Sequence, residues 1–459
     1  MYDLTQEQKD IIEAICNLPI VLVDAKAGTG KTSTSFSSVV TLKPKKGFYT
    51  AFNKSIVVEA QEKFPPNMEC KTKHAFALKY VQPKLRIEDF TYLCIKEKLS
   101  YPNKRLIMDV MNSFFLSASV DMEEYMSVLD DPKLEAIAIQ YIEQMINDEI
   151  PPTFNFLLKY LHMLLHQELI EINYDLAILD ECQDTTAVFF EIFKLLKAEH
   201  KLVVGDPFQN IYGFMNTVNA FNLIDKDVPK FQLTKTFRCS KAIARRVQKF
   251  GQKYLDSNFK YIGTDSEPKE DSIAYIGRTN GSILMRLQEI LEKKQSFSLT
   301  RPVKEIFAMP MALANVASGR EIYHKKYKYL EKEYSNYTRS GMKGFYSYLL
   351  KYVEDDELHS CIKFMNTIRE KRINIFDLKK QAEAITPDSN VWIVTAHSFK
   401  GREVDTVVIE ESLNRSVGKI IEKGGPENNQ DQEELNLYYV GITRAKHKLL
   451  NAKYAPHGN

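Results

Sequence analysis

The chain has 459 residues, of which 44% are hydrophobic and 27% are charged, and its formal net charge is +2. This composition is that of a folded globular protein, so it excludes an intrinsically disordered chain, and the length allows about two to four domains. A charge this close to zero does not identify a nucleic-acid-binding protein, so any basic surface must come from local arrangement.

Cysteine usage and hydropathy indicate the compartment. The six cysteines are scattered without a C-x-x-C pair, which indicates reduced thiols rather than a disulfide or zinc framework. No run reaches the roughly 18 apolar residues that a membrane span needs. The N-terminal stretch also lacks the basic-then-apolar pattern of a signal peptide. We therefore expect a cytoplasmic protein, in the nucleoid or the host cytoplasm if it is bacterial or viral.

The first predicted elements are a buried strand over residues 20–23, a loop of small residues and a helix that begins near Lys31. The stretch from Ala25 to Thr32 has the A-x-x-x-x-G-K-T spacing of a phosphate-binding loop, with Ala in place of the usual first Gly. Lys31 brings charge to the outer phosphates, and Thr32 is placed to ligate Mg²⁺. The strand–loop–helix setting favours a nucleotide site over a chance glycine-rich turn.

The next region has helical periodicity, for example over residues 108–120 and 141–150, and predicts a helical insertion over residues 83–165. His162 and His166 have the spacing of a zinc helix. They lack a Glu after the first His and a third ligand, so we interpret them as residues of an amphipathic helix.

An apolar strand then ends in Asp180 and Glu181. A carboxylate at a strand tip suits Mg²⁺ binding, and its neighbour can orient or deprotonate an attacking water. A solvated acidic strand end is the alternative for an isolated Asp-Glu pair. Together with the upstream phosphate loop, the pair favours a site of phosphoryl transfer.

The strand-to-acid pattern repeats in VVGDPFQNIYGF, residues 203–214. A neutral amide at Gln209 can contact both water and the terminal phosphate, and so report the presence of that phosphate. Tyr212 and Phe214 lie too far along the chain for the same phosphate, and an aromatic pair is a platform for a flat base. A packed turn remains the alternative for these aromatic residues. The loop is therefore predicted to face two ligands.

Three further stretches complete the chain. Residues 320–352 are dense in Lys, Arg and Tyr, which suits a helical subdomain that contacts nucleic-acid backbone; a solvated helical face with inward tyrosines fits equally well. The polar run over residues 422–434 contains Gly-Gly-Pro and predicts a surface loop. Trp392 lies in an apolar strand and is predicted to be a core residue.

In this order, the motifs resemble those of superfamily 1 helicases of the UvrD/Rep type. The resemblance is closest to the F-box DNA helicase branch and its small bacterial and viral relatives. The matching segments are LTQEQKDII, the phosphate loop, AFNKSIVVEA, CKTKHAFAL, LDECQD, VGDPFQNIYGF, LTKTFRCS, IAYIGRTN, VTAHSFKGREVDTVVI and LNLYYVGITRAKHKL. One departure is Phe214-Met215-Asn216-Thr217, where the family commonly has Phe-Arg-Gly-Ala. The departure removes an arginine that would contact phosphate or base.

The resemblance implies an α/β fold with two RecA-like P-loop motor domains, each a parallel sheet flanked by helices and each with a mainly helical insertion. The implied parts are 1–82 and 166–235 for the first motor and 83–165 for its insertion, then 236–284 and 386–459 for the second motor and 285–385 for its insertion. The second insertion is shorter than in the large bacterial repair helicases.

The resemblance also implies ATP and Mg²⁺ as cofactors. The implied catalytic residues are Lys31, Asp180, Glu181, Gln209, Arg238 and Arg444, and the implied metal ligands are Thr32 and Asp180. The implied nucleotide-binding residues are Gln8, Ala25, Ala27, Gly28, Thr29, Gly30, Lys31, Thr32, Thr34, Phe237, Arg238, Glu403 and Arg444. The implied DNA contacts are Phe52, Asn53, Lys54, His74, Tyr212, Phe214, Asn280, His397 and Lys400.

The implied activity is ATP-driven translocation on single-stranded DNA with 3′→5′ polarity, together with unwinding at duplex junctions, in replication, recombination or repair. A monomer suffices, since the chain supplies both arginines at the γ-phosphate. Two alternatives stay open. One is a DNA-stimulated ATPase that mainly strips proteins from single strands. The other is a nucleotide-gated DNA-binding switch with little turnover.

Overall fold

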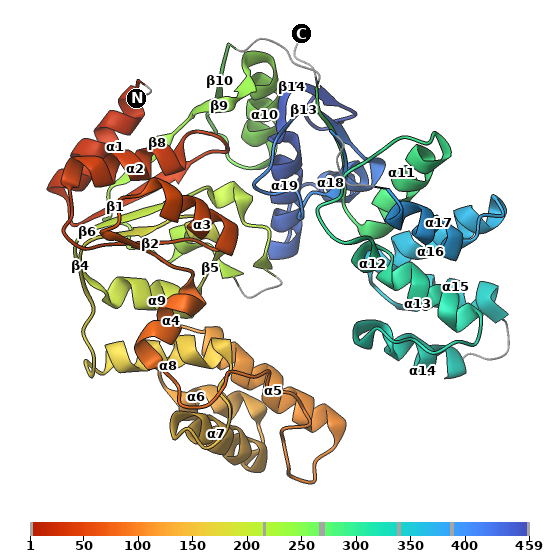
Figure 1. Ribbon diagram of the computed structural model, residues 1–459, viewed down its shortest axis with the longest axis horizontal. Helices are drawn as coiled ribbons and strands as arrows, with labels where there is room; N and C mark the ends of the chain where they lie inside the picture. The colour runs from red at the N-terminus through yellow and green to blue at the C-terminus, as the bar shows by residue number, and fades with distance from the viewer. Residues whose placement is uncertain (1–2, 214–216, 266–270, 337–340, 386–389, 457–459) are drawn as a thin grey trace. The chain divides into compact units, whose positions relative to one another are not determined.

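The computed structural model describes residues 3–213, 217–265, 271–336, 341–385 and 390–456 (Figure 1). The chain divides into two compact units, Met1–Thr234 and Lys235–Asn459, and each has its own parallel sheet. The predicted α/β class with helix-flanked parallel sheets is thereby confirmed. All six cysteines are free thiols, and no helix of the described part of the chain is long and apolar enough to cross a membrane.

The first unit has a six-stranded parallel sheet in the order β3-β2-β4-β6-β1-β8. Most residues of the inner strands β1 and β4 are buried, as is typical of a parallel sheet covered by helices on both sides. The strands are β1 Ile20–Ala25, β2 Gly47–Thr50, β3 Met68–Cys70, β4 Asn173–Leu179, β6 Lys197–Gly205 and β8 Lys230–Leu233.

Alternating side chains of β1 show how the sheet is covered. Val21 and Val23 join one apolar cluster with helices α1, α2 and α3, whereas Leu22 joins the cluster that contains α4 and α9. The helices are α1 Gln6–Asn17, α2 Lys31–Leu42, α3 Lys54–Lys63, α4 Lys73–Val81 and α9 Ala187–Leu195. Two short strands, β5 Thr185–Thr186 just before α9 and β7 Thr217–Val218 between β6 and β8 in the chain, form a small antiparallel ribbon.

Four helices, drawn in orange and yellow in Figure 1, lie between α4 and β4. They are α5 Tyr101–Leu116, α6 Met122–Met126, α7 Pro132–Ile146 and α8 Phe154–His166. Side-chain acceptors of Ser100, Asp121, Asp131 and Thr153 cap their N-termini. The four helices share one apolar cluster with the sheet, so the predicted division at residues 82 and 166 stays an interpretation.

The α8 helix contains the two histidines with zinc-helix spacing. His162 is 2% exposed, whereas His166 is exposed, as the amphipathic interpretation expects. Within the described ranges, no group of three or more His, Cys, Asp or Glu side chains is arranged to hold a metal ion. The same helix carries a buried lysine, Lys159, whose Nζ donates to the backbone oxygens of Ser117 (2.8 Å) and Ser119 (2.6 Å).

The second unit has a four-stranded parallel sheet in the order β12-β11-β13-β14 and a separate parallel pair, β9 and β10. The strands are β9 Lys235–Ser240, β10 Ile262–Thr264, β11 Ile273–Gly277, β12 Val391–Thr395, β13 Val404–Ile409 and β14 Ala445–Leu450. The helices that accompany them are α10 Lys241–Tyr254, α11 Asn280–Glu292, α18 Glu411–Glu422 and α19 Asn429–Ile442.

The segment between α11 and β12 is helical. Its elements are α12 Val303–Ile306, α13 Ala308–Ala317, η6 Lys325–Tyr327, α14 Tyr329–Asn336, α15 Gly341–Tyr352, α16 Asp356–Glu370 and α17 Ile375–Glu383. Tyr327 and Tyr346 are buried in its apolar cluster, whereas Tyr323 is 85% exposed and Tyr352 is 63% exposed. The tyrosines of this stretch therefore divide between the two interpretations that the sequence left open.

Two sequence expectations in this unit were wrong in part. The surface loop predicted over residues 422–434 spans only residues 423–428, because Asn428 accepts a hydrogen bond from the Asp431 amide and begins α19. Trp392 is half-buried rather than a core residue. Its ring lies against Phe399, and the Arg402 guanidinium lies 5.1 Å from the ring centroid.

Arg246 of α10 is 5% exposed and holds the last described segment of the chain. Its guanidinium donates to the carbonyl oxygens of Leu449 (2.6 Å) and Ala455 (2.7 Å). These two bonds tie β14 and the segment after it to α10, so this segment is part of the fold.

Candidate nucleotide and nucleic-acid site

The phosphate loop joins β1 to α2. Gly28 and Gly30 have φ angles of 71° and 86°, in the left-handed region that favours glycine. Gly30 is the N-cap of α2 and provides no side-chain hydrogen bond to the first turn. The amides of that turn and the positive end of the helix dipole are therefore suited to an anion such as phosphate.

Lys31, at the first position of α2, lies 2.8 Å from a carboxylate oxygen of Glu181. Burial opposes the charge of the lysine, but the carboxylates of Glu181, Asp180 and Asp206 prevail and raise the pKa of Lys31. Lys31 is therefore an ammonium held among three acids. A phosphate that entered the loop would compete with Glu181 for it.

Asp180 is 2% exposed at the end of β4. Its Oδ2 accepts a 2.7 Å hydrogen bond from the Tyr49 hydroxyl, and its Oδ1 accepts from the Glu181 amide at 2.8 Å. Burial, together with the charge of Glu181, raises the pKa of Asp180 to about 6, against the opposing effect of Lys31. A cation that binds beside such a buried carboxylate stabilises its ionised form.

The residues present fit Mg²⁺. Hard oxygen donors are the ligands that this ion prefers, and it usually takes one or two carboxylates and keeps water and phosphate as its other ligands. The Asp180 carboxylate and the Thr32 hydroxyl are donors of this type, and the raised pKa of Asp180 marks negative charge that a cation would stabilise.

Gln183 links the acidic pair to the Gln209 loop. Its Nε2 donates to Glu181 at 2.6 Å, and its Oε1 accepts from the Asp206 amide at 3.0 Å. Asp206 in turn accepts from Gln209 Nε2 at 2.7 Å. A Cβ at Gly205 would lie 2.5 Å from Gln183 Oε1, so this position requires glycine for the close approach. Sequence reasoning assigned no role to Gln183.

Gln8, predicted to read adenine, is 3% exposed. Its Nε2 donates to Thr34 Oγ1 at 3.1 Å, and its Oε1 accepts from the Thr5 amide at 3.0 Å. The structure thus brings Gln8 together with Thr34, another predicted nucleotide-binding residue. Both ends of the Gln8 amide are bonded within the protein, and its contact with adenine stays a prediction.

Two of the predicted DNA-binding residues stack on each other. The rings of Phe52 and Tyr212 have centroids 5.1 Å apart and an interplanar angle of 15°. The ammonium of Lys73 lies 5.8 Å from the Phe52 centroid. Burial lowers the pKa of Lys73 to about 8, against the opposing charge of Asp184. Sequence reasoning did not select Lys73. Phe214 lies outside the described residues.

Of the other predicted DNA contacts of the first unit, Asn53 and Lys54 follow Phe52 in sequence and His74 follows Lys73. Asn53 caps α3 by accepting from the Ile56 amide at 3.0 Å, and Lys54 is exposed at the first position of that helix. His74 is bonded to Asn155 at 3.3 Å, and burial lowers its pKa to about 4, so the imidazole is neutral near pH 7. A neutral His74 would contact DNA by hydrogen bonding or packing rather than by charge.

The predicted nucleotide-binding residues of the second unit lie close together. Arg238 Nε is 2.6 Å from a Glu403 carboxylate oxygen, and both arginines bond to Thr443. Arg444 is 2% exposed, with its Nε donating to the Val440 carbonyl at 2.9 Å. Burial, reinforced by the charge of Arg238, lowers the pKa of Arg444 to about 10. Phe237, beside this cluster in sequence, is 50% exposed.

The predicted DNA contacts of the second unit are spread over two elements. Asn280 begins α11, and its side chain accepts a hydrogen bond from Arg301. His397 and Lys400 are both half-buried in the turn after β12, which ends in Gly401 with a φ angle of 89°.

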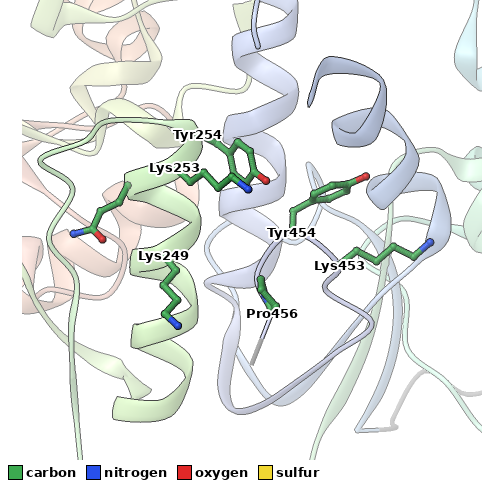
Figure 2. A pocket seen from close by; sticks show the side chains of 7 residues that line it. Lys249, Lys253, Tyr254, Lys453, Tyr454 and Pro456 are labelled. Atoms are coloured by element: carbon green, nitrogen blue, oxygen red, sulfur yellow. The ribbon is translucent and has the colours of Figure 1, made fainter. Parts of the chain in front are cut away.

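A cavity of about 540 Å³ lies on the second unit, between α10 and the segment after β14 (Figure 2). Tyr254 and Tyr454 meet edge to face there, with ring centroids 6.4 Å apart, and Lys453 is paired with Glu411 at 2.9 Å. Its described lining residues are Lys249, Gln252, Lys253, Tyr254, Lys453, Tyr454 and Pro456, none of which belongs to the predicted site.

The parallel sheets, the strand–phosphate-loop–helix connection at β1 and the acidic pair at the end of β4, which is separated from β1 by β6, define a P-loop α/β protein. Within this class, residues 97–454 match the model of the UvrD-like helicase C-terminal domain, and the chain belongs to this helicase family. The resemblance inferred from the motifs is thereby confirmed.

Curated relatives carry helicase names. The chain is 26% identical to F-box DNA helicase protein 1 of Schizosaccharomyces pombe, over 97% of this chain and 57% of that protein. It is 23% identical to F-box DNA helicase 1 of Gallus gallus, over 99% of this chain and 49% of that protein. A "Probable DNA helicase" of Mycoplasma pneumoniae is 22% identical, over 99% of this chain and 86% of that protein. The chain thus spans about half the length of the two F-box relatives.

Proposed function

We propose that this chain is an ATP-dependent DNA helicase that translocates on single-stranded DNA with 3′→5′ polarity and separates strands at duplex junctions. The observation that carries the proposal is one hydrogen-bonded chain in the first unit: Lys31–Glu181–Gln183–Asp206–Gln209. It connects a phosphate loop to a loop that also supplies one ring of a stacked aromatic pair. Binding or loss of the terminal phosphate at Lys31 can therefore be transmitted through hydrogen bonds to Gln209, and through the backbone of the same loop to Tyr212.

ATP binding rests on the phosphate loop. The loop amides and Lys31 bind the outer phosphates, and Thr32 and Asp180 would hold Mg²⁺, which neutralises phosphate charge when bound. The Lys31 ammonium lies 2.8 Å from the Glu181 carboxylate. The incoming γ-phosphate displaces Glu181 from Lys31, because the two anions compete for the same ammonium.

Hydrolysis then uses the released carboxylate. Glu181 accepts a proton from the attacking water, whose oxygen forms a bond to the γ-phosphorus while the bond to the β–γ bridging oxygen breaks. Gln183 holds one carboxylate oxygen of Glu181 at 2.6 Å and so fixes the direction of the other. Gln209 contacts the water and the terminal phosphate.

Arg238 and Arg444 are proposed to stabilise the negative charge that develops on the γ-phosphate, and Phe237 to stack on adenine. The clustering of the two arginines around Thr443 supports a joint role. Arg444 is buried and bonded within its unit, so it must change its side-chain conformation to reach a phosphate.

Nucleic-acid binding is assigned to the Phe52–Tyr212 pair together with Asn53, Lys54 and His74. Aromatic faces bind bases of any sequence, and lysines provide contacts to the backbone. Asn280, His397 and Lys400 of the second unit are proposed as further contacts.

The test combines turnover and strand separation. ATP hydrolysis is measured with and without single-stranded DNA, and unwinding is measured on duplexes that carry either a 3′ or a 5′ tail. We expect DNA to stimulate hydrolysis and only the 3′-tailed duplex to open. Opening of the 5′-tailed duplex alone would overturn the polarity, and hydrolysis at one rate with or without DNA would overturn the motor itself.

A third substrate separates the remaining alternatives. Single-stranded DNA coated with a binding protein is presented beside the tailed duplex. Displacement of the protein with little duplex opening would indicate an ATPase that clears single strands. Tight nucleotide-dependent DNA binding with little turnover would indicate a switch.

A further inference from the structure

Lys26 lies inside the phosphate loop at a position that the loop pattern leaves unspecified. It is only 4% exposed, although lysine is almost never fully buried unless it is paired. A charged side chain in this location requires compensation from its neighbours.

One neighbour of Lys26 is at the end of β1. The Lys26 ammonium lies 2.5 Å from Asp24 Oδ1, and both side chains are almost completely buried. Lys230 of β8 approaches the other oxygen of Asp24 at 3.6 Å and is 48% exposed. Asp24 therefore has an inner and an outer lysine partner, of which only the inner one is in the phosphate loop.

The other neighbour of Lys26 is the Gln209 loop. The ammonium lies 4.6 Å from the centroid of the Phe208 ring, a cation–π contact at a desolvated position. Phe208 and Gln209 both bond to Asp206: the Phe208 amide donates to Oδ1 at 3.2 Å, and Gln209 Nε2 donates to Oδ2 at 2.7 Å. Lys26 thus touches the short helix η3 Pro207–Gln209, which carries the amide of Gln209.

We propose that Lys26 is a positioning residue that fixes the Gln209 loop against the phosphate loop, so that the Gln209 amide is held where a terminal phosphate arrives. The inference rests on the proposed ATP hydrolysis and deepens it. The contacts act in series: Asp24 holds the ammonium, the ammonium holds Phe208 and stabilises the Asp206 carboxylate, and that carboxylate holds Gln209.

Electrostatics supports this role. Asp206 is fully buried, and burial raises its pKa, while Lys26 and then Lys31 oppose the rise and Asp24 adds to it. The Gln209 amide bonds best to the ionised form of Asp206. When the charge of Lys26 is removed, the pKa of Asp206 rises further, and the carboxylate protonates at a higher pH. The acidic limb of the pH–rate profile should then move to higher pH.

The test compares Lys26→Met with Lys230→Met. Both changes remove an ammonium from Asp24, but only the first one removes the contact to Phe208 and the Lys26 charge that opposes the raised pKa of Asp206. We expect Lys26→Met to lower kcat for ATP about 10- to 100-fold, to change KM less than about threefold, and to shift the acidic limb upward. Lys26→Arg should restore the position of the acidic limb, because it keeps the charge. Lys230→Met should stay within about twofold of the wild type.

A second measurement does not depend on turnover. Because Gln209 is held for the terminal phosphate, the ratio of affinities for a non-hydrolysable ATP analogue and for ADP should fall about five- to tenfold in Lys26→Met and stay unchanged in Lys230→Met. If Lys26→Met does not fold, Phe208→Leu removes the cation–π contact and keeps the Lys26 ammonium, and the affinity ratio should fall in the same direction.

The two proposals fail differently. A wild-type protein without DNA-stimulated hydrolysis would contradict the proposed function, and the affinity ratio would still test Lys26. Wild-type-like kcat, acidic limb and affinity ratio in folded Lys26→Met would overturn the inference for Lys26. So would equal losses in Lys26→Met and Lys230→Met, because they would mean that only the charge balance of Asp24 matters.

Discussion

Lys31 and Glu181 form an ion pair of 2.8 Å across the first unit, from the N-terminus of α2 to the residue that follows β4. Glu181 holds this position with a φ angle of 51°, a conformation that non-glycine residues rarely adopt. Such strain persists where surrounding contacts hold a residue in place, and here Gln183 and Lys31 do so. In the site without ATP, Lys31 is therefore paired with Glu181.

Glu181→Gln should retain ATP and DNA binding and lose most of the turnover, by about 10²- to 10⁴-fold, because the amide cannot accept the proton of the attacking water. Steady-state hydrolysis and nucleotide titration on the same protein check this. The matched control is Glu171→Gln, which neutralises an exposed carboxylate that is paired with Lys197 and Asn173. Wild-type-like hydrolysis in Glu181→Gln would remove Glu181 from the catalytic role.

Tyr212→Ala should weaken DNA-stimulated turnover more than basal turnover, because a base loses its stacking partner while the phosphate loop is unchanged. Loss of one stacked base corresponds to about 1–3 kcal/mol, or roughly a 5- to 150-fold increase in the DNA concentration that gives half-maximal stimulation. Tyr92→Ala serves as the control, since Tyr92 is a partly exposed aromatic residue of the same unit. Equal losses of basal and stimulated turnover would mean that the Tyr212 ring is only structural. For Phe214→Ala we expect the same pattern as for Tyr212→Ala.

Lys159 predicts a pH dependence of stability. Burial lowers its pKa to about 7 in the folded protein, against 10.5 for an ordinary lysine. Between these values the unfolded chain binds the proton and the folded chain does not, so the free energy of unfolding rises with pH, by about 1.4 kcal/mol per unit. Below pH 7 both states are protonated, and the slope from this group vanishes.

Denaturant unfolding at pH 6, 7, 8 and 9 measures the effect as a difference between wild type and Lys159→Met. Lys73 and Lys201 also have pKa values lowered by burial to about 8, but both remain in the variant, so their contributions cancel. The wild type should gain stability relative to the variant above pH 7. Parallel curves for the two proteins would show that Lys159 titrates outside this range.

The segment around η6 offers a test of the Lys- and Tyr-rich stretch. Buried Ile322 and Leu330 anchor it, and it exposes Tyr323, His324, Lys325, Lys326 and Tyr329. If this surface contacts DNA backbone, replacing Lys325 and Lys326 by Gln should lower the salt dependence of DNA affinity by about two units of logarithmic slope.

The control for that change is the exposed lysine pair Lys43 and Lys45 of the first unit, replaced in the same way. An unchanged salt slope in the Lys325/Lys326 variant would favour the other interpretation, a solvated face whose tyrosines pack inward.

The local parts of the site were predictable and the supporting parts were not. The phosphate loop and Asp180 could be predicted from strand ends and glycine spacing, because the residues that form each motif are close together in the sequence. Tyr49 is separated from Asp180 by 131 positions and reaches it only because β2 pairs with β4. No periodicity indicates such a pairing.

Other omissions have the same cause. Lys26 and Lys73 stand within motifs that sequence reasoning quoted, but their importance depends on burial and on rings brought from a distant loop. The start of α19 at Asn429 could have been found, since Asn428 followed by Asp431 is a helix-capping pattern.

The two carbonyls bonded to Arg246 have a consequence for shortened versions of the chain. A premature stop just before Leu449 would remove both acceptors of a guanidinium that is 5% exposed. A buried cation without acceptors is costly, so the whole second unit would loosen. Proteolytic sensitivity should then extend back into α10, about 200 positions earlier in the sequence.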